Sequence, residues 1–185
     1  MAVNLWKQDM GFVFVPVGRV SSLFYYLEVR NICLLTINDI SFMRNKCLSG
    51  SVGEGKLLFR SSECPWSREM RDGKEVPNQV TDGPYLFRTA TGRLGMIWTS
   101  WIHNVYTQGV AYSQSGTLDG PWIQESEPIT PPDFGHGMLF QTFEGKWLMA
   151  VHSHKEMNGV YIRIPHLFEV DLSGDKLKVG KEYKP

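Results

Sequence analysis

Two short motifs hold residue types that could carry out acid–base or metal chemistry. Asp82 lies in the run 81–84 (Thr-Asp-Gly-Pro), and His136 lies between two glycines in the run 134–137 (Phe-Gly-His-Gly). A carboxyl group can give or take a proton, and an imidazole can do so near neutral pH or bind a metal. By composition alone, the first motif is also typical of a turn and the second of a surface loop. Their position in a longer pattern makes both of them candidates for a functional site.

A 53-residue repeat relates the segments that follow these motifs. Residues 84–101 align without gaps over residues 137–154, with six identities in eighteen positions. Each copy has an apolar stretch, a turn at Gly92 or Gly145, and a second apolar and aromatic stretch, which is typical of a β-hairpin. A repeat of about this length is typical of the blades of a β-propeller.

Strands must therefore position the two motifs. After each hairpin the chain offers two more strands, at 106–114 and 120–125 in the first copy and at 165–172 and 176–179 in the second. Four strands make one propeller blade. The sequence thus predicts an all-β fold of the β-propeller type, an incomplete ring of about two and a half blades. It leaves open a β-sandwich built from two similar hairpin pairs.

The innermost strand of each propeller blade begins at the mouth of the central channel, so residues at the starts of successive inner strands converge. The repeat places Asp82 at the start of one inner strand and His136 at the start of the next. We therefore expect a carboxyl group and an imidazole at one mouth. The partial propeller domain is expected over residues 51–185, with a strand of a preceding blade at 55–61. Residues 1–50 form an atypical N-terminal segment without a copy of the repeat.

Composition limits the partners of the chain. With 185 residues, 42% of them hydrophobic and 12% aromatic, the sequence can bury the core of one domain. Nineteen basic and nineteen acidic residues cancel, so no net field draws the chain to nucleic acid or to an anionic membrane. No apolar run reaches membrane-spanning length, and no secretory signal is recognisable in residues 1–38, so we leave localisation open. We expect a neutral partner.

In their order along the chain, these motifs resemble the successive blade motifs of glycoside hydrolase family 43. The matching runs are 81–86, 112–113, 120–122, 135–137, 145–147 and 151–152, with 62–66 similar to one branch of the family. The resemblance implies a five-bladed β-propeller that hydrolyses O-glycosyl bonds of arabinose- or xylose-containing glycans with inversion, as an α-L-arabinofuranosidase or β-xylosidase. Its substrates would be arabinan, arabinoxylan or xylan oligosaccharides, and members of the family are often secreted or periplasmic.

The resemblance also implies roles for single residues. Asp82 holds the position before Gly-Pro that carries the general acid, where the family usually has glutamate. His136 matches a histidine that faces a central cation, often Ca²⁺, through water, which suits a cation that prefers oxygen ligands. The residues expected to contact the sugar are Trp98, Trp101, His152 and Arg163. The two tryptophans lie three apart on one strand and face opposite sides, so packing between blades is the alternative for either.

The sequence departs from the family pattern at the position of the catalytic base. In the family it is an aspartate that opens the first blade, typically followed by proline, and no Asp-Pro dipeptide occurs in this sequence. Three interpretations stay open: a truncated hydrolase with impaired activity, an active hydrolase whose base comes from the N-terminal segment or a neighbouring subunit, and a non-catalytic carbohydrate-binding or protein-interaction propeller. Because an incomplete ring exposes apolar blade faces, we also expect self-association.

Overall fold

The computed structural model describes residues 32–36, 39–44 and 56–184 of the chain. Its strands are β1 (Ile32–Thr36), β2 (Asp39–Arg44), β3 (Lys56–Arg60), β4 (Arg68–Arg71), β5 (Lys74–Pro77), β6 (Asp82–Arg88), β7 (Leu94–Ile102), β8 (Val105–Ser113), β9 (Trp122–Gln124), β10 (Gly135–Gln141), β11 (Trp147–Met157), β12 (Val160–Asp171) and β13 (Lys178–Glu182). A short 3-10 helix covers Ser61–Glu63, and the described residues contain no α-helix. Most of segment 1–50 lies outside the described residues, so its expected atypical character stays a prediction.

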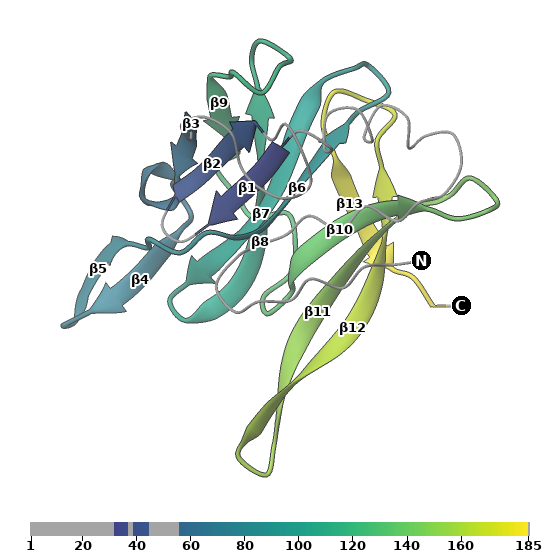
Figure 1. The fold of residues 1–185 in the computed structure, drawn as a ribbon. Helices are drawn as coiled ribbons and strands as arrows, with labels where there is room; N and C mark the ends of the chain where they lie inside the picture. Colours follow the sequence, from purple (N-terminus) through teal and green to yellow (C-terminus); the bar gives the residue numbers. More distant parts are fainter. Residues whose placement is uncertain (1–31, 37–38, 45–55, 185) are drawn as a thin grey trace.

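The described strands form three separate sheets (Figure 1). Strands β6 to β9 pair in order as an antiparallel four-stranded unit, and the β4–β5 hairpin joins it through one parallel pair, Arg68 with Ile102. Strands β10 to β13 form a second antiparallel four-stranded unit. The two four-stranded units that the repeat predicts are therefore confirmed.

The third sheet precedes these two units in the chain. Its order is β1-β2-β3, so the strand expected at 55–61 is present as β3 at a sheet edge. Strands β1 and β2 come from the segment in which the sequence shows no copy of the repeat. One sheet of three strands beside two units of four, each packed on the next, is an arrangement of propeller blades rather than a two-sheet sandwich.

The central unit, β6 to β9, is covered on both faces. Along β7, the residues from Leu94 to Ser100 are all buried. Successive side chains point to opposite faces of a strand, and here they enter two different hydrophobic clusters. Trp98 belongs to the cluster that contains Phe59 of β3, whereas Ile97 belongs to the cluster that contains Met149 of β11. Burial on both faces explains why this part of the repeat is a nearly continuous apolar run.

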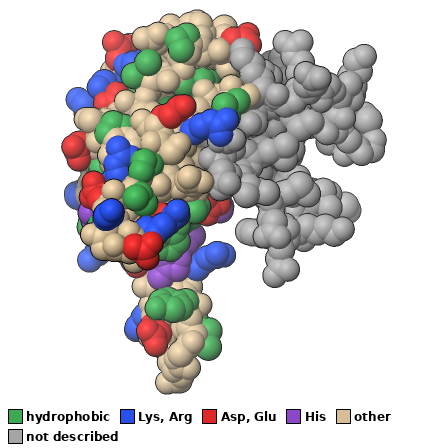
Figure 2. Space-filling view, turned by 90° about the vertical axis from the view of Figure 1, so that its left-hand side faces the viewer, with side chains coloured by type: hydrophobic (Ala, Val, Ile, Leu, Met, Phe, Trp, Pro, Cys, Tyr) green, Lys and Arg blue, Asp and Glu red, His purple; other side chains and the backbone are tan. Residues whose placement is uncertain are grey.

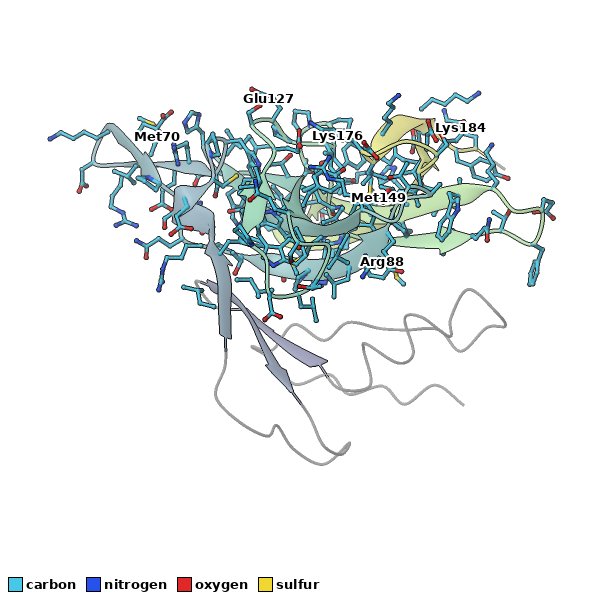
Figure 3. The ribbon with its side chains drawn as sticks, turned by 90° about the horizontal axis from the view of Figure 1, so that it is seen from above. Met70, Arg88, Glu127, Met149, Lys176 and Lys184 are labelled. Carbon is cyan, nitrogen blue, oxygen red and sulfur yellow. The ribbon has the colours of Figure 1, made fainter. Side chains whose placement is uncertain are left out.

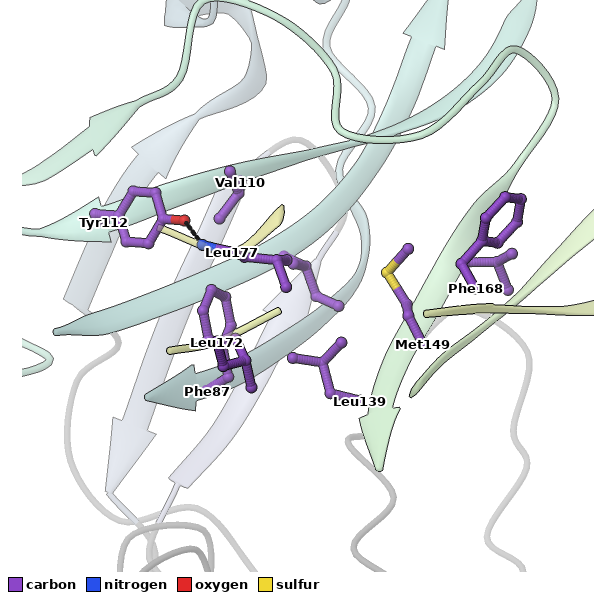
Figure 4. Close-up of a cluster of buried hydrophobic side chains, with 10 residues drawn as sticks. Phe87, Val110, Tyr112, Leu139, Met149, Phe168, Leu172 and Leu177 are labelled. Carbon is purple, nitrogen blue, oxygen red and sulfur yellow. Dashed lines mark hydrogen bonds between the residues drawn. The ribbon is translucent and has the colours of Figure 1, made fainter. Parts of the chain in front are cut away.

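The second of these clusters joins the central unit to the β10–β13 unit (Figure 4). Its buried members are Phe87, Ile97, Val110, Tyr112, Leu139, Met149, Val151, Phe168, Leu172 and Leu177. The hydroxyl of Tyr112 enters this apolar seam and accepts a hydrogen bond of 2.8 Å from the backbone N–H of Leu177. Because the buried hydroxyl has a partner, the seam closes without an unsatisfied group at this point.

The hairpin of β11 and β12 extends past the rest of its sheet (Figure 1). Strand β10 pairs with β11 as far as His152, but the pairing of β11 with β12 continues to Met157 and Val160. Strand β12 therefore begins well before the predicted strand at 165–172. We name residues 153–164 the arm.

Within the described ranges, no helix is long and apolar enough to cross a bilayer.

Two methionines provide a matched test of the seam. Met149 lies amid the packed sheets and Met70 at the outer end of the β4–β5 hairpin (Figure 3), with exposed fractions of 0% and 49%. We expect Met149→Ala to lower the free energy of unfolding by about 2–5 kcal/mol, because it opens a cavity in the seam. Met70→Ala should change it by less than about 0.5 kcal/mol. Urea unfolding of both variants measures the difference, and equal effects would contradict the blade packing described here.

Candidate functional site at two inner-strand bulges

Both inner strands begin with a bulge, and the two bulges occupy equivalent positions in the repeat. The register of β6 with β7 shifts between Asp82 and Tyr85, and that of β10 with β11 shifts between Gly135 and Met138. In the 53-residue register, Gly83 corresponds to His136, and both have a left-handed backbone, with φ of 49° and 54°. For a histidine this conformation costs about 1–2 kcal/mol. Such strain persists where surrounding structure holds it in place.

The central unit supplies the groups that hold the β10 bulge. The backbone N–H of His136 donates to the Thr99 hydroxyl at 2.8 Å, and that of Gly137 donates to the Gln108 side-chain oxygen at 2.6 Å. Both Thr99 of β7 and Gln108 of β8 are completely buried. They replace the ladder hydrogen bonds that the bulge lacks, and they fix the direction in which the imidazole of His136 points.

The glycines of the second motif follow from this close contact. A Cβ atom at Gly135 would lie 2.5 Å from Thr99 Cγ2, and one at Gly137 would lie 2.7 Å from the end of the Gln108 side chain. Gly83 also has no room for a side chain, because a Cβ atom there would lie 2.9 Å from Cγ of the His136 ring in the neighbouring unit. The Gly-His-Gly run is therefore required by how closely the two units approach.

The two bulges bring Asp82 and His136 into contact, as the repeat predicts. Asp82 Oδ2 lies 3.0 Å from His136 Nδ1 and accepts a hydrogen bond of 2.7 Å from the Tyr106 hydroxyl. Asp82 Oδ1 accepts a hydrogen bond of 2.8 Å from the backbone N–H of Gly83. The carboxyl group is thus held by three donors from two blades, and its side chain and that of His136 are still partly exposed to solvent.

These donors determine the charge of Asp82. Burial acts to raise its pKa, but the hydrogen bond and the charge of His136, together with the hydrogen bonds of Tyr106 and Gly83, lower the pKa to about 2. Asp82 is therefore ionised at neutral pH. Burial, and then the charge of Asp82, raise the pKa of Tyr106 far above its ordinary value, so the phenol stays protonated and donates.

Aromatic and imidazole rings surround this carboxylate. We name the Asp–His cluster by its members, which are Asp82, Trp101, Tyr106, His136, His152 and His154. The ring of Tyr106 stacks on that of His152 at 5.5 Å and meets that of His154 edge-on at 5.2 Å. The ring of Trp101 lies 4.9 Å from that of Tyr106. Sugar rings bind to such mixed surfaces of aromatic faces and polar groups.

His152 and His154 differ in their surroundings. Burial, and then the positive charges of Arg163 and of the neighbouring histidines, lower the pKa of His152 to about 4, so its ring is neutral at pH 7. Its Nε2 atom is buried without a hydrogen-bond partner among the described residues. His154 is held by Asp133, whose carboxylate contacts His154 Nδ1 at 2.8 Å and accepts from its backbone N–H at 2.9 Å.

The structure corrects the expectation for Trp98. Its side chain is 0% exposed, packs against Phe59 and Trp66, and donates its indole N–H to Gln124 at 3.0 Å. It is a core residue and cannot contact a sugar at the cluster. Trp101, on the opposite face of the same strand, does lie in the cluster. Arg163 is exposed and lies opposite His154 in the register of β11 with β12, beside the cluster.

The sequence did not single out Tyr106 or Asp133. Tyr106 is the second residue of β8 and follows the tight β7–β8 turn, in which His103 and Asn104 both have positive φ. Because β7 runs antiparallel to the inner strand, this turn lies at the same end of the blade as Asp82. The position of a hairpin end relative to the inner strand is the signal that would have identified Tyr106.

The expected calcium role of His136 finds little support in the donor set. No three His, Cys, Asp or Glu side chains converge as metal ligands among the residues that the structure describes. Nδ1 of His136 already contacts Asp82. Calcium takes six to eight oxygen ligands, so the described side chains alone do not fit a calcium centre. A contact through water stays a prediction.

Comparison with solved structures provides a family for this fold. An endo-arabinase from Bacteroides thetaiotaomicron is 30% identical with a TM-score of 0.62, and the match covers 82% of this chain and 50% of that chain. A thermostable family-43 glycoside hydrolase is 20% identical with a TM-score of 0.61, covering 80% and 49%. An endo-1,4-β-xylanase from B. thetaiotaomicron is 20% identical with a TM-score of 0.55, covering 83% and 60%.

This chain thus spans about half the length of the first two of these structures. No protein-family model and no curated protein matches its sequence. The similarity to the three structures agrees with the order of the blade motifs and with the packing of the described units. The described part of the chain therefore has the fold of about half of a five-bladed β-propeller of glycoside hydrolase family 43.

Proposed function

We propose that this chain is the acid-bearing part of an inverting glycoside hydrolase that acts on arabinose- or xylose-containing glycans. The observation that carries the proposal is the contact of 3.0 Å between Asp82 and His136, which come from successive blades of a family 43 fold. The similar structures are named as an endo-arabinase and an endo-1,4-β-xylanase. Arabinan, arabinoxylan and xylan oligosaccharides are therefore the substrates to test first.

Asp82 would act as the general acid. In inverting hydrolysis, one carboxylic acid protonates the leaving oxygen while a carboxylate across the bond deprotonates water. The carboxyl group of Asp82 would need its proton when the sugar is bound. A sugar that excludes water and draws His136 away would raise the pKa of Asp82, because burial already acts in that direction.

The sugar would lie against Trp101, His152 and Arg163. Trp101 offers an aromatic face, and the neutral ring of His152 is partly exposed and stacks on Tyr106. We assign the catalytic base to none of the described residues. Asp133, the other carboxylate in contact with the cluster, has both oxygens engaged by His154. Self-association also stays a prediction.

A second function, carbohydrate binding without hydrolysis, is favoured by one observation. The pKa of Asp82 is lowered to about 2, whereas a general acid at neutral pH needs a raised pKa. An ionised carboxylate beside aromatic rings accepts hydrogen bonds from sugar hydroxyls and serves binding equally well. The two functions differ in whether Asp82 is needed for turnover or only for affinity.

Replacing Asp82 separates these functions. If Asp82 is the acid, Asp82→Asn should lower turnover of arabino- and xylo-oligosaccharides by about 10²–10⁴-fold, while the dissociation constants change far less. Asp175→Asn, in an exposed turn, is the matched control and should keep the wild-type rate. Reducing-sugar release and calorimetry measure the two quantities. Binding by the wild type without turnover would establish the second function, and full turnover by Asp82→Asn would reject Asp82 as the acid.

The pKa of Asp82 can be tested directly. His136→Gln removes the strongest influence that lowers it, so we expect the pKa to rise from about 2 toward or above 3.8, the ordinary value. Because the pKa is depressed in the folded protein, the stabilisation it contributes is present above about pH 4 and is lost as pH falls toward 2. The wild type should therefore lose more melting temperature than Asp82→Asn over this range.

Carboxyl-carbon NMR of the wild type and of His136→Gln gives the titration, with His103→Gln as the control. His103 also pairs with a carboxylate at an exposed site, but its partner is Glu75 rather than Asp82. An unchanged pKa of Asp82 in His136→Gln would show that the contact seen here does not govern its charge.

A further inference from the structure

The arm, residues 153–164, leaves the body of the molecule beside the Asp–His cluster. Figure 2 shows histidine side chains gathered at the base of this protrusion. The β11 side of the arm lies beyond His152, where the pairing with β10 ends. The β12 side of the arm precedes Phe168, where the pairing with β13 begins. Within the part of the chain that the structure describes, the two strands of the arm therefore pair only with each other. A two-stranded ribbon is marginally stable by itself, so contacts at its root must set its direction.

Both faces of the root carry such contacts. On one face, Ser153 Oγ lies 2.9 Å from His166 Nε2, and His166 Nδ1 lies 2.7 Å from Glu182 Oε1, which ties β11, β12 and β13 together. On the other face, Asp133 holds both the ring and the backbone N–H of His154. The arm is therefore fixed where it leaves the sheet, and the orientation of its two faces is defined.

One face of the arm continues the surface of the cluster. His154 lies opposite Arg163, and Glu156 lies opposite Tyr161. Because side chains alternate along strands, these four side chains share one face. The ring of His154 stacks with that of Trp101 at 6.4 Å, so this face is the one turned toward the cluster.

The two faces differ in chemistry toward the tip. Tyr161 is 72% exposed on the face shared with the cluster, with the carboxylate of Glu156 across from it. Met157 and Val160, 47% and 60% exposed, form a separate pair at the tip. An aromatic ring next to a hydrogen-bonding group is a combination that binds sugars, because the ring packs on C–H groups while the polar group pairs with hydroxyls.

The distance between the cluster and the outer part of the arm determines how long a bound sugar must be. Glu156 lies four residues beyond His152 along β11, which corresponds to about 13 Å. One pentose ring cannot span that distance, so a single sugar would reach the cluster or Tyr161 but not both. A glycan chain that begins at the cluster and continues along the arm would reach both.

We propose that Tyr161 and Glu156 form an outer sugar-binding subsite on the arm, which gives the protein a preference for long oligosaccharides. The proposal rests on the proposed function, because the same glycan chain would occupy the cluster and the arm. Tyr161 stacks on a pentose ring, and Glu156 accepts hydrogen bonds from its hydroxyls. The ligand class is a neutral arabinose or xylose oligomer long enough to cover both places.

Calorimetry with oligosaccharides of two lengths tests this subsite. Tyr161→Ala in the full chain should weaken binding of arabinohexaose or xylohexaose by about three- to tenfold, the loss expected for one stacking contact. Binding of arabinobiose or xylobiose, which would occupy the cluster alone, should not change. Tyr161→Phe should retain hexaose affinity. Val160→Ala, which changes the neighbouring side chain on the other face, is the matched control.

Each outcome decides the proposal. Equal hexaose affinity in Tyr161→Ala and the wild type would overturn the outer subsite while leaving the proposed function intact. A wild type that binds neither length of sugar would overturn both. A change of sedimentation-derived mass in Tyr161→Ala, with no change in hexaose affinity, would instead identify the arm as a contact between copies of the chain and overturn the sugar assignment.

Discussion

The site depends on hydrogen bonds that cross from one blade to the next. The Thr99 hydroxyl and the Gln108 amide oxygen accept the backbone N–H groups of the bulge at His136, where strand pairing leaves them without a ladder partner. Both side chains are completely buried, so either one without its partner would be costly. This arrangement holds the imidazole in a left-handed backbone conformation, aimed at the carboxylate of Asp82. Packing between blades therefore defines the geometry of the Asp–His cluster.

The same geometry explains why aspartate and glutamate are not equivalent at position 82. The carboxylate of Asp82 is short enough to contact its own neighbour, the N–H of Gly83, and to reach Tyr106 and His136 with its other oxygen. A glutamate would carry its carboxyl group one methylene farther from the backbone and away from the Gly83 N–H. The depressed pKa of Asp82 is thus partly a consequence of its length, because each donor favours the ionised form.

Much of the fold could be predicted from the sequence because blade units repeat and inner-strand starts are equivalent by register. That reasoning predicted the contact of Asp82 with His136. It could not decide which of Trp98 and Trp101 is the core residue and which lies at the cluster. Because side chains alternate along a strand, the two must face opposite sides, but the sequence does not show which side a neighbouring blade covers. The choice depends on Phe59, which lies on a different sheet. Tyr106 was missed because it lies on β8, just after a turn, rather than at the start of an inner strand, and the repeat argument considered only inner-strand starts.

The arm and the cluster are parts of one connected structure. Asp133 donates its backbone N–H to the carbonyl of Tyr106 and holds His154 with its carboxylate, and Tyr106 in turn donates to Asp82. A ligand that moves His154 from the arm side would act on Asp133 and Tyr106, and through the Tyr106 hydroxyl on the charge of Asp82. Because the hydrogen bond from Tyr106 lowers the pKa of Asp82, weakening it would favour the protonated carboxyl group. The charge of Asp82 therefore depends on the same contacts that fix the root of the arm.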